Sequence, residues 1–115
     1  MYPPTKSFKD LIVWQKSKLL AIEIYHITEQ FPRSELYGLT SQMRRAVISI
    51  SSNIAEGYRR FHKKEKRQFF VVAFGSGAEL ESKIEIAKTL FSEISCGPAE
   101  LLLEEIMKML NKIIV

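Results

Sequence analysis

The nine residues from Arg59 to Arg67 carry six cations, and residue types at this spacing are suited to holding a polyanion. The cations are Arg59, Arg60, Lys63, Lys64, Lys66 and Arg67. Only Glu65 opposes them, so six positive charges against one negative charge leave a net charge of +5. Three rings that could stack on bases lie beside them, Tyr58, Phe61 and His62. Three interpretations remain open: a solvated connection between helices, contact with a nucleic-acid backbone through its phosphates, and contact with an acidic protein surface. Any binding through this stretch would be salt-sensitive, without strong dependence on base sequence.

A second group of cations, Arg44 and Arg45, favours an internal role. If two helices form a hairpin that turns near Phe61, residues equally far from the turn lie level with one another. Arg44 and Arg45 then face Glu79, with Glu81 half a turn beyond. We expect ion pairs across this hairpin, which would fix its register more than they would stabilise it. Direct contact of these two arginines with nucleic acid is the alternative.

No arrangement of residues indicates catalysis. His26 lies within an expected helix, and the cations around His62 would oppose its protonation. Cys96 is the single cysteine and has no evident base beside it, and no Ser–His–acid set is visible. The "GSG" at residues 75–77 falls inside an expected helix rather than before one, unlike a phosphate-binding loop. We expect a non-enzymatic protein without metal or cofactor.

Length and composition predict one globular domain over residues 1–115, with disorder expected only at residues 1–6. Hydrophobic residues make up 46% of the 115 residues and charged residues 26%, values ordinary for a soluble globular protein. No apolar run approaches the roughly 18–20 residues of a membrane span. Pro3, Pro4 and Lys6 stand where a signal peptide would be apolar, and one cysteine excludes an internal disulfide. A cytoplasmic protein is expected.

The net charge of +4 is unevenly placed along the chain. Residues 1–67 hold 13 Lys and Arg against 6 Asp and Glu, a net charge of +7. Residues 68–115 hold 4 against 7, a net charge of −3. This polarity favours association with an anionic partner or with the acidic surface of another copy, and does not choose between them.

Apolar spacing predicts four helices that would position these residues. The first runs from a cap at Ser7 to Phe31, because Pro32 pushes the residue before it out of the helical region. The second starts near Ser34 and ends between Glu56 and Phe61, with Gly57 as a candidate cap. The third starts near Lys63, and the break at residues 96–98 precedes the fourth. Short connections predict an all-α, antiparallel up-down-up-down four-helix bundle.

The expected apolar positions recur at steps of three or four residues. On the first helix they are Phe8, Leu11, Ile12, Leu19, Ile22, Tyr25 and Ile27. On the second they are Leu36, Leu39, Met43, Val47, Ile50, Ile54 and Tyr58. On the third they are Phe69, Ala73, Ser76, Leu80, Ile84, Ala87, Phe91 and Ile94. On the fourth they are Leu102, Ile106, Met109, Leu110 and Ile113. Gly75 and Gly77 weaken the third helix, which indicates close approach of a neighbouring backbone.

Several segments resemble the bacterial four-helix bundle proteins, also called 23S rRNA intervening-sequence proteins. They are "YGLTSQMRRAVISISSNIAEGYRR" at residues 37–60, "FGSGAELESKIEIAK" at residues 74–88, "FKDLIVWQKS" and "FPRSELYGL". The resemblance extends to about Leu90. It departs from the family at Gly77, where a bulkier apolar residue is usual, and this departure predicts looser packing around the third helix.

The resemblance implies a compact antiparallel bundle that assembles into a ring, commonly a homopentamer. It also relates the chain to the accessory protein of diversity-generating retroelements, a basic barrel that binds nucleic acid and a reverse transcriptase. Surplus apolar positions on the outer helices independently favour an oligomer. They are Ile12, Leu20, Ile24, Ile27, Leu101, Leu103 and Ile114.

Two functions are therefore expected from the sequence. The first is an oligomeric protein that binds RNA or DNA through residues 59–67. The second is a protein–protein scaffold without nucleic-acid contact, in which those residues form only a solvated connection or meet an acidic protein partner.

Overall fold

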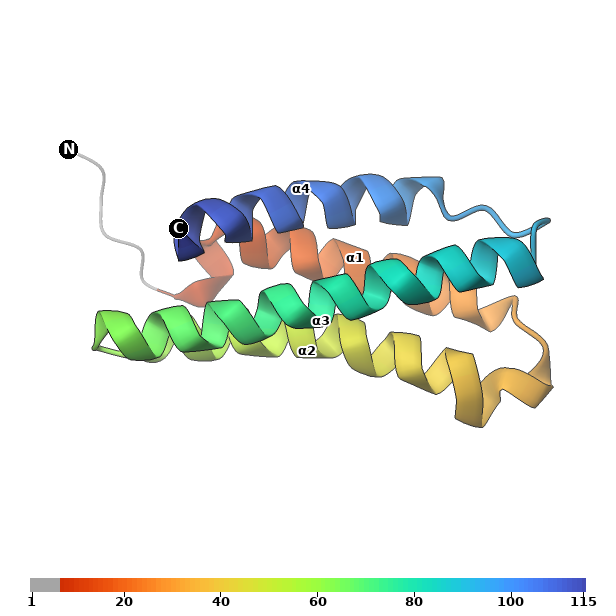
Figure 1. Cartoon of the computed structure of the whole chain (residues 1–115), viewed down its shortest axis with the longest axis horizontal. Helices are drawn as coiled ribbons and strands as arrows, with labels where there is room; N and C mark the ends of the chain where they lie inside the picture. The colour runs from red at the N-terminus through yellow and green to blue at the C-terminus, as the bar shows by residue number, and fades with distance from the viewer. Residues whose placement is uncertain (1–6) are drawn as a thin grey trace.

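The computed structural model describes residues 7–115, and the expected disorder of residues 1–6 lies outside that range. Helices form nearly all of the described chain, so the all-α prediction is confirmed (Figure 1). The elements are η1 (Phe8–Asp10), α1 (Ile12–Glu29), η2 (Arg33–Glu35), η3 (Leu36–Thr40), α2 (Ser41–Arg59), α3 (Lys63–Leu90) and α4 (Gly97–Ile114). They form a rod with principal extents of 48 × 24 × 21 Å.

The four long helices run alternately up and down and close into a bundle (Figure 1). Each packs against the next along the chain, and α1 also packs against α4. The connection between α2 and α3 lies at the same end of the rod as the end of α4 (Figure 1). The connections from α1 to α2 and from α3 to α4 lie at the opposite end. This topology is the up-down bundle that the sequence predicts.

The first two helices begin later than the sequence predicts. Ser7 and Asp10 form a capping box, but it closes only the short turn η1. The backbone is extended at Leu11, and α1 starts at Ile12. Before α2, the Glu35 carboxylate accepts a hydrogen bond from the Leu39 N–H (3.2 Å), and Gly38 bends the chain with φ −112° and ψ −115°. The expected cap at Ser34 is therefore replaced by an irregular lead-in that ends at Thr40.

The predicted core positions are confirmed in the middle of α2 and α3. Met43, Val47, Ile50 and Ile54 are buried along α2. Ala73, Leu80, Ile84 and Ala87 are buried along α3. On α4, Ala99, Leu103, Ile106 and Leu110 are buried, so Leu103, which the sequence marks as surplus, belongs to the core.

The buried face of α1 differs from the predicted one. Four positions of the predicted stripe are exposed, Ile12, Leu19, Ile22 and Tyr25. Its buried apolar residues are Val13, Leu20, Ile24 and Ile27. Ile27 confirms one position of the predicted stripe, whereas Leu20 and Ile24, which the sequence marks as surplus, belong to the core. Apolar residues occupy both sides of this helix, so spacing alone selected the wrong stripe. The exposed apolar side chains form a second face, which we call the outer α1 face (Ile12, Leu19, Ile22 and Tyr25).

Three glycines on α2 and α3 have different surroundings. Gly57 lies inside α2 and is buried, and a Cβ there would meet the Phe70 ring at 3.1 Å. A Cβ on Gly77 would clash with Met107 Sδ, so the Met107 side chain fills the space that a larger residue would take. Neighbouring side chains, not backbone, thus approach Gly57 and Gly77, and the loose packing expected around Gly77 is absent. At Gly75 a Cβ would meet nothing within 4 Å.

These surroundings predict that alanine stabilises the protein at Gly75 more than at Gly57. Gly75→Ala should raise the free energy of unfolding by about 1 kcal/mol, because alanine is the better helix former and the space is open. Gly57→Ala brings the same gain in helix propensity but displaces Phe69 and Phe70, which is a typical overpacking cost. Urea unfolding of the two variants would show Gly75→Ala to be the more stable. Equal or reversed stabilities would contradict the packing described at Gly57.

Candidate nucleic-acid interface

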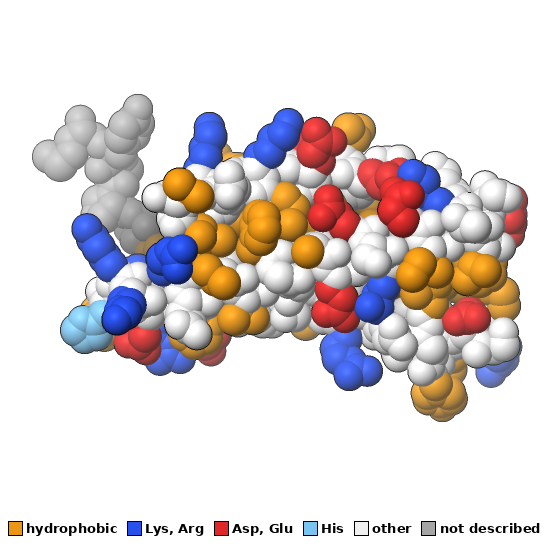
Figure 2. Space-filling view, viewed as in Figure 1, with side chains coloured by type: hydrophobic (Ala, Val, Ile, Leu, Met, Phe, Trp, Pro, Cys, Tyr) orange, Lys and Arg blue, Asp and Glu red, His pale blue; other side chains and the backbone are white. Residues whose placement is uncertain are grey.

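The six predicted cations lie together at one end of the rod, on the connection between α2 and α3 and the first turns of α3. We call residues 59–67 the basic hairpin. α2 ends at Arg59, residues 60–62 make the turn, and α3 starts at Lys63. Lys, Arg and His side chains gather at this end of the molecule, while most Asp and Glu side chains visible in the same view lie further along the rod (Figure 2). The structure divides the six cations into two groups.

Arg60 belongs to the group that holds the fold together. Its guanidinium lies 2.9 Å from a Glu56 carboxylate oxygen on α2 and 3.8 Å from Glu65 on α3. The same group lies over the Phe69 ring, 4.8 Å from the centroid. Arg60 therefore joins the two helices across their turn.

The side chains of Lys66 and Arg67 cap the C-terminal ends of two other helices, α2 and α4. Lys66 Nζ donates hydrogen bonds to the Tyr58 carbonyl (2.8 Å) and the Gly57 carbonyl (3.4 Å) in the last turn of α2. Arg67 Nε donates to the Ile114 carbonyl (3.1 Å) at the end of α4. The last carbonyls of a helix lack partners within the helix and carry its negative pole, so cations are favourable there. These two side chains are engaged with the bundle.

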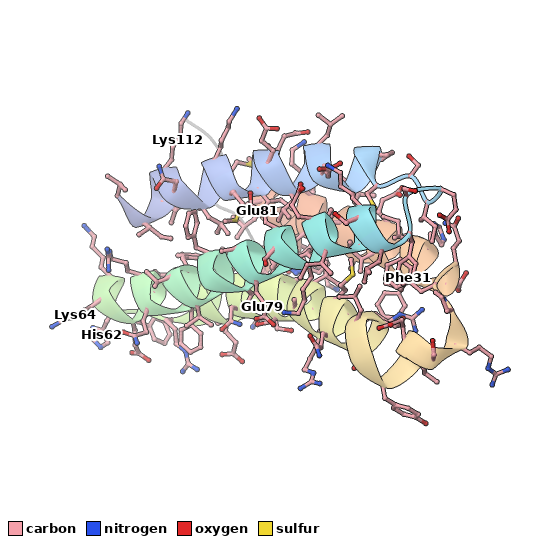
Figure 3. All side chains as sticks on the ribbon, turned by 45° about the vertical axis from the view of Figure 1, so that its right-hand side comes forward. Phe31, His62, Lys64, Glu79, Glu81 and Lys112 are labelled. Atoms are coloured by element: carbon pink, nitrogen blue, oxygen red, sulfur yellow. The ribbon has the colours of Figure 1, made fainter. Side chains whose placement is uncertain are left out.

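Lys63 and Lys64 form the second group, together with Arg59. Both lysines are exposed, and within residues 7–115 neither makes an ion pair or a hydrogen bond through its side chain. Lys64 and the neighbouring His62 project from the end of the rod (Figure 3). Arg59 is also exposed, with its guanidinium 5.8 Å from the centroid of the Phe8 ring. Arg67 is exposed too, but it bonds to the Ile114 carbonyl, whereas these three side chains make no hydrogen bond within residues 7–115.

The start of α3 is an unusual place for two lysines. His62 is its N-cap residue and makes no side-chain capping hydrogen bond. The positive pole of the helix and its first N–H groups therefore lie beside two further positive charges. Glu65 in the same turn offsets part of this charge, and the two lysines oppose helix stability. The same arrangement provides N–H donors and cations for a phosphate group.

Phe61 is almost fully exposed. Its side chain is 95% exposed at the turn, directly before the two lysines. His62 is also exposed, whereas Tyr58 is half-buried and lies beside Lys66, whose Nζ is 5.6 Å from its ring centroid. Two of the three predicted rings are thus presented to solvent.

Arg44 has partners other than those predicted. Its Nε donates to Thr28 Oγ1 (2.9 Å), and its guanidinium stacks on Tyr25 at 4.4 Å from the ring centroid. Arg44 thus connects α2 to α1. Arg44 and Arg45 cannot both face α3, because adjacent residues of a helix point in directions about 100° apart. The expected pairing with Glu79 or Glu81 does not form.

Arg45 and Glu79 lie beside the same hollow between α2 and α3, as the predicted register requires, with Ser49 and Ser76 also lining it. Within residues 7–115, Arg45 makes no ion pair with either acid, and Glu79 instead meets Lys83 at 3.3 Å. The direct link between the helices here joins Ser49 Oγ to Ser76 Oγ (2.8 Å). Glu79 and Glu81 lie along the middle of α3 (Figure 3).

Cys96 and His26 show no catalytic arrangement in the described part of the chain. Cys96 is buried, and burial, followed by the charge of Glu100, raises the pKa of its thiol. A raised pKa disfavours the reactive thiolate. His26 is exposed on α1. Residues 7–115 contain no group of three or more His, Cys, Asp or Glu side chains placed to hold a metal ion, and none of their helices is long and apolar enough to cross a membrane.

Acidic side chains concentrate on the other half of the molecule. Glu81, Glu85, Glu100 and Glu104 line a hollow of about 300 Å³ between α3 and α4, with Ile84 and Leu103 also lining it. Lys88 bonds to Glu100 (3.0 Å) and Glu85 (3.3 Å), and these bonds raise the pKa of Lys88. The glutamates of this hollow thus lie on α3 and α4, away from the basic hairpin.

Fold and surface together define an all-α bundle with a basic end and no visible catalytic centre in its described part. The comparisons agree with this class. The family model described as 23S rRNA-intervening sequence protein matches residues 9–112, and the chain belongs to that family. No curated protein matches the sequence.

Proposed function

We propose that this protein is a non-enzymatic, oligomeric helical bundle that binds the backbone of RNA or DNA through the basic hairpin, in the cytoplasm. The observation that carries the proposal is the pair of lysines, Lys63 and Lys64, at an uncapped helix start. Lysines that served only solubility would be tolerated anywhere on the surface. Here they oppose the helix dipole, and such local conflicts are expected where a ligand resolves them.

A bound phosphate would relieve this conflict. It would accept hydrogen bonds from the N–H groups at the start of α3 and neutralise the lysines beside them. Arg59, at the end of α2, supplies a third exposed cation within the same hairpin. Such contacts carry no base information, so the expected binding is salt-dependent and tolerant of sequence.

The outer α1 face supports the oligomeric part of the proposal. Its four side chains are large, apolar or aromatic, and exposed in the single chain. An apolar stripe of this kind usually marks an interface. The family resemblance implies a ring, commonly a homopentamer, and a ring would repeat the basic hairpin once per subunit. Linked weak sites bind one long polyanion far more tightly than a single site does.

A protein–protein scaffold without nucleic-acid contact is the second candidate. The glutamate-lined hollow between α3 and α4 favours it, because a basic protein segment would be attracted there. In this case the basic hairpin would be dispensable for partner capture.

Titration of fluorescently labelled RNA and DNA with the full chain, from about 50 mM to about 200 mM salt, tests the proposal. We expect binding at the lower salt concentration and its progressive loss at the higher one. The absence of binding at low salt would contradict the proposal and leave the scaffold.

A further inference from the structure

We infer that the basic hairpin selects single-stranded over duplex nucleic acid, with Phe61 stacking on an unpaired base while Lys63 and Lys64 hold the adjoining phosphates. This inference rests on the proposed function and specifies its ligand. It begins from the 95% exposure of Phe61 at the extreme end of the rod. Among the described residues, no aromatic ring packs against the Phe61 ring and no cation lies over it.

The position of Phe61 distinguishes it from the other aromatic residues nearby. Phe69 lies under Arg60, and Phe70 is buried against Gly57, so both belong to the packing of the hairpin. Phe61 contributes nothing comparable to that packing. Its ring stands two residues before Lys63, at the turn that brings Arg59 and the start of α3 together. A flat apolar face is thus placed among side chains suited to phosphates.

The chemistry of this combination favours an unpaired strand. Proteins that bind single strands combine a basic surface for the backbone with exposed rings on which bases stack. Stacking does not discriminate strongly among bases, because every base has a π face. In a duplex, the faces of internal bases are already stacked on their neighbours, so the Phe61 ring would find only backbone. The lysines should therefore act on both forms of nucleic acid, and Phe61 on one.

The test compares wild type with Phe61→Ala, using a labelled homopolymeric single strand and a labelled duplex at about 50 mM salt. We expect Phe61→Ala to weaken single-strand binding about tenfold and to leave duplex binding within about twofold of wild type. Tyr37→Ala is the matched control, because Tyr37 is 93% exposed and lies in η3, at the opposite end of the rod. It should change neither affinity. Circular dichroism would check that both variants fold.

A second variant reports stacking directly. Trp14 is the single tryptophan, so Phe61→Trp in a Trp14→Phe background places the only indole at the hairpin. Stacking predicts retained single-strand affinity and quenching of its fluorescence on binding. If Phe61→Ala weakens both forms equally, or neither, the inference is wrong although the proposed function stands. Failure of wild type to bind either form would overturn both. Binding to anionic phospholipid vesicles is measured in parallel. If Phe61→Ala weakens vesicle binding and leaves nucleic-acid binding unchanged, Phe61 contacts a membrane surface and the inference is wrong.

Discussion

Replacing Leu20 with alanine should lower the free energy of unfolding by about 2–5 kcal/mol, the largest effect on stability that we predict. Leu20 lies on α1 and is fully buried in the core. Removing its side chain loses buried apolar area and leaves a cavity that the bundle fills only in part. Chemical denaturation at one fixed protein concentration measures the change, because the stability of an oligomer depends on concentration.

Leu19 provides the matched control one residue away. It is 53% exposed on the outer α1 face of the single chain, so Leu19→Ala should lower the free energy of unfolding by less than Leu20→Ala does, because it leaves no cavity in the core and its cost arises only at the proposed subunit interface. Leu19→Glu should instead disrupt assembly, lowering the mass found by light scattering towards the 13.3 kDa of one chain. Equal destabilisation by Leu19→Ala and Leu20→Ala would contradict the assignment of the two faces. A wild type of 13.3 kDa would contradict the oligomer.

Charge reversal of the solvent-facing lysines has the largest expected effect on binding. Lys63→Glu with Lys64→Glu should reduce the affinity for a single strand by on the order of 50-fold or more at about 50 mM salt. Two phosphate contacts are lost, and two negative charges then repel the strand. The fold should be retained or slightly stabilised, because acidic residues suit the first turn of α3. Parallel binding and thermal-unfolding measurements on the same preparation would show both results.

Lys66→Glu with Arg67→Glu changes charge by the same amount and should act on stability instead. These side chains terminate α2 and α4 through carbonyl hydrogen bonds. Their replacement by carboxylates puts like charge at two negative helix poles, with an expected cost of about 1–3 kcal/mol. If this variant is as stable as wild type, the capping role is wrong.

The sequence predicts the bundle most clearly on α2, where spacing leaves one plausible face. Met43, Val47, Ile50 and Ile54 recur at steps that only a helix places on one side, and all four are buried. α1 lacks this contrast. Leu19 and Leu20 are equally apolar, and only packing against α2 and α4 decides which is buried.

The sequence predicts where the basic hairpin lies. It does not predict which of its cations bond to the bundle and which face solvent. The register that sets Arg45 level with Glu79 also sets Lys66 level with Gly57 and Tyr58, so the cap on α2 had a signal in the sequence. The bond from Arg67 to Ile114 had none, because it joins residues 47 positions apart. Arg44 likewise reaches Thr28 on a helix outside the hairpin, where register within the hairpin gives no information.

The salt dependence of binding tests most directly which cations meet the nucleic acid. For single strands, the slope of log K against log salt concentration is about 0.7 for each phosphate contact. The account predicts that Lys63→Gln with Lys64→Gln reduces the magnitude of this slope by about 1.4 relative to wild type, while Lys66→Gln with Arg67→Gln leaves it unchanged. A slope that both variants reduce equally, or that neither reduces, would contradict it.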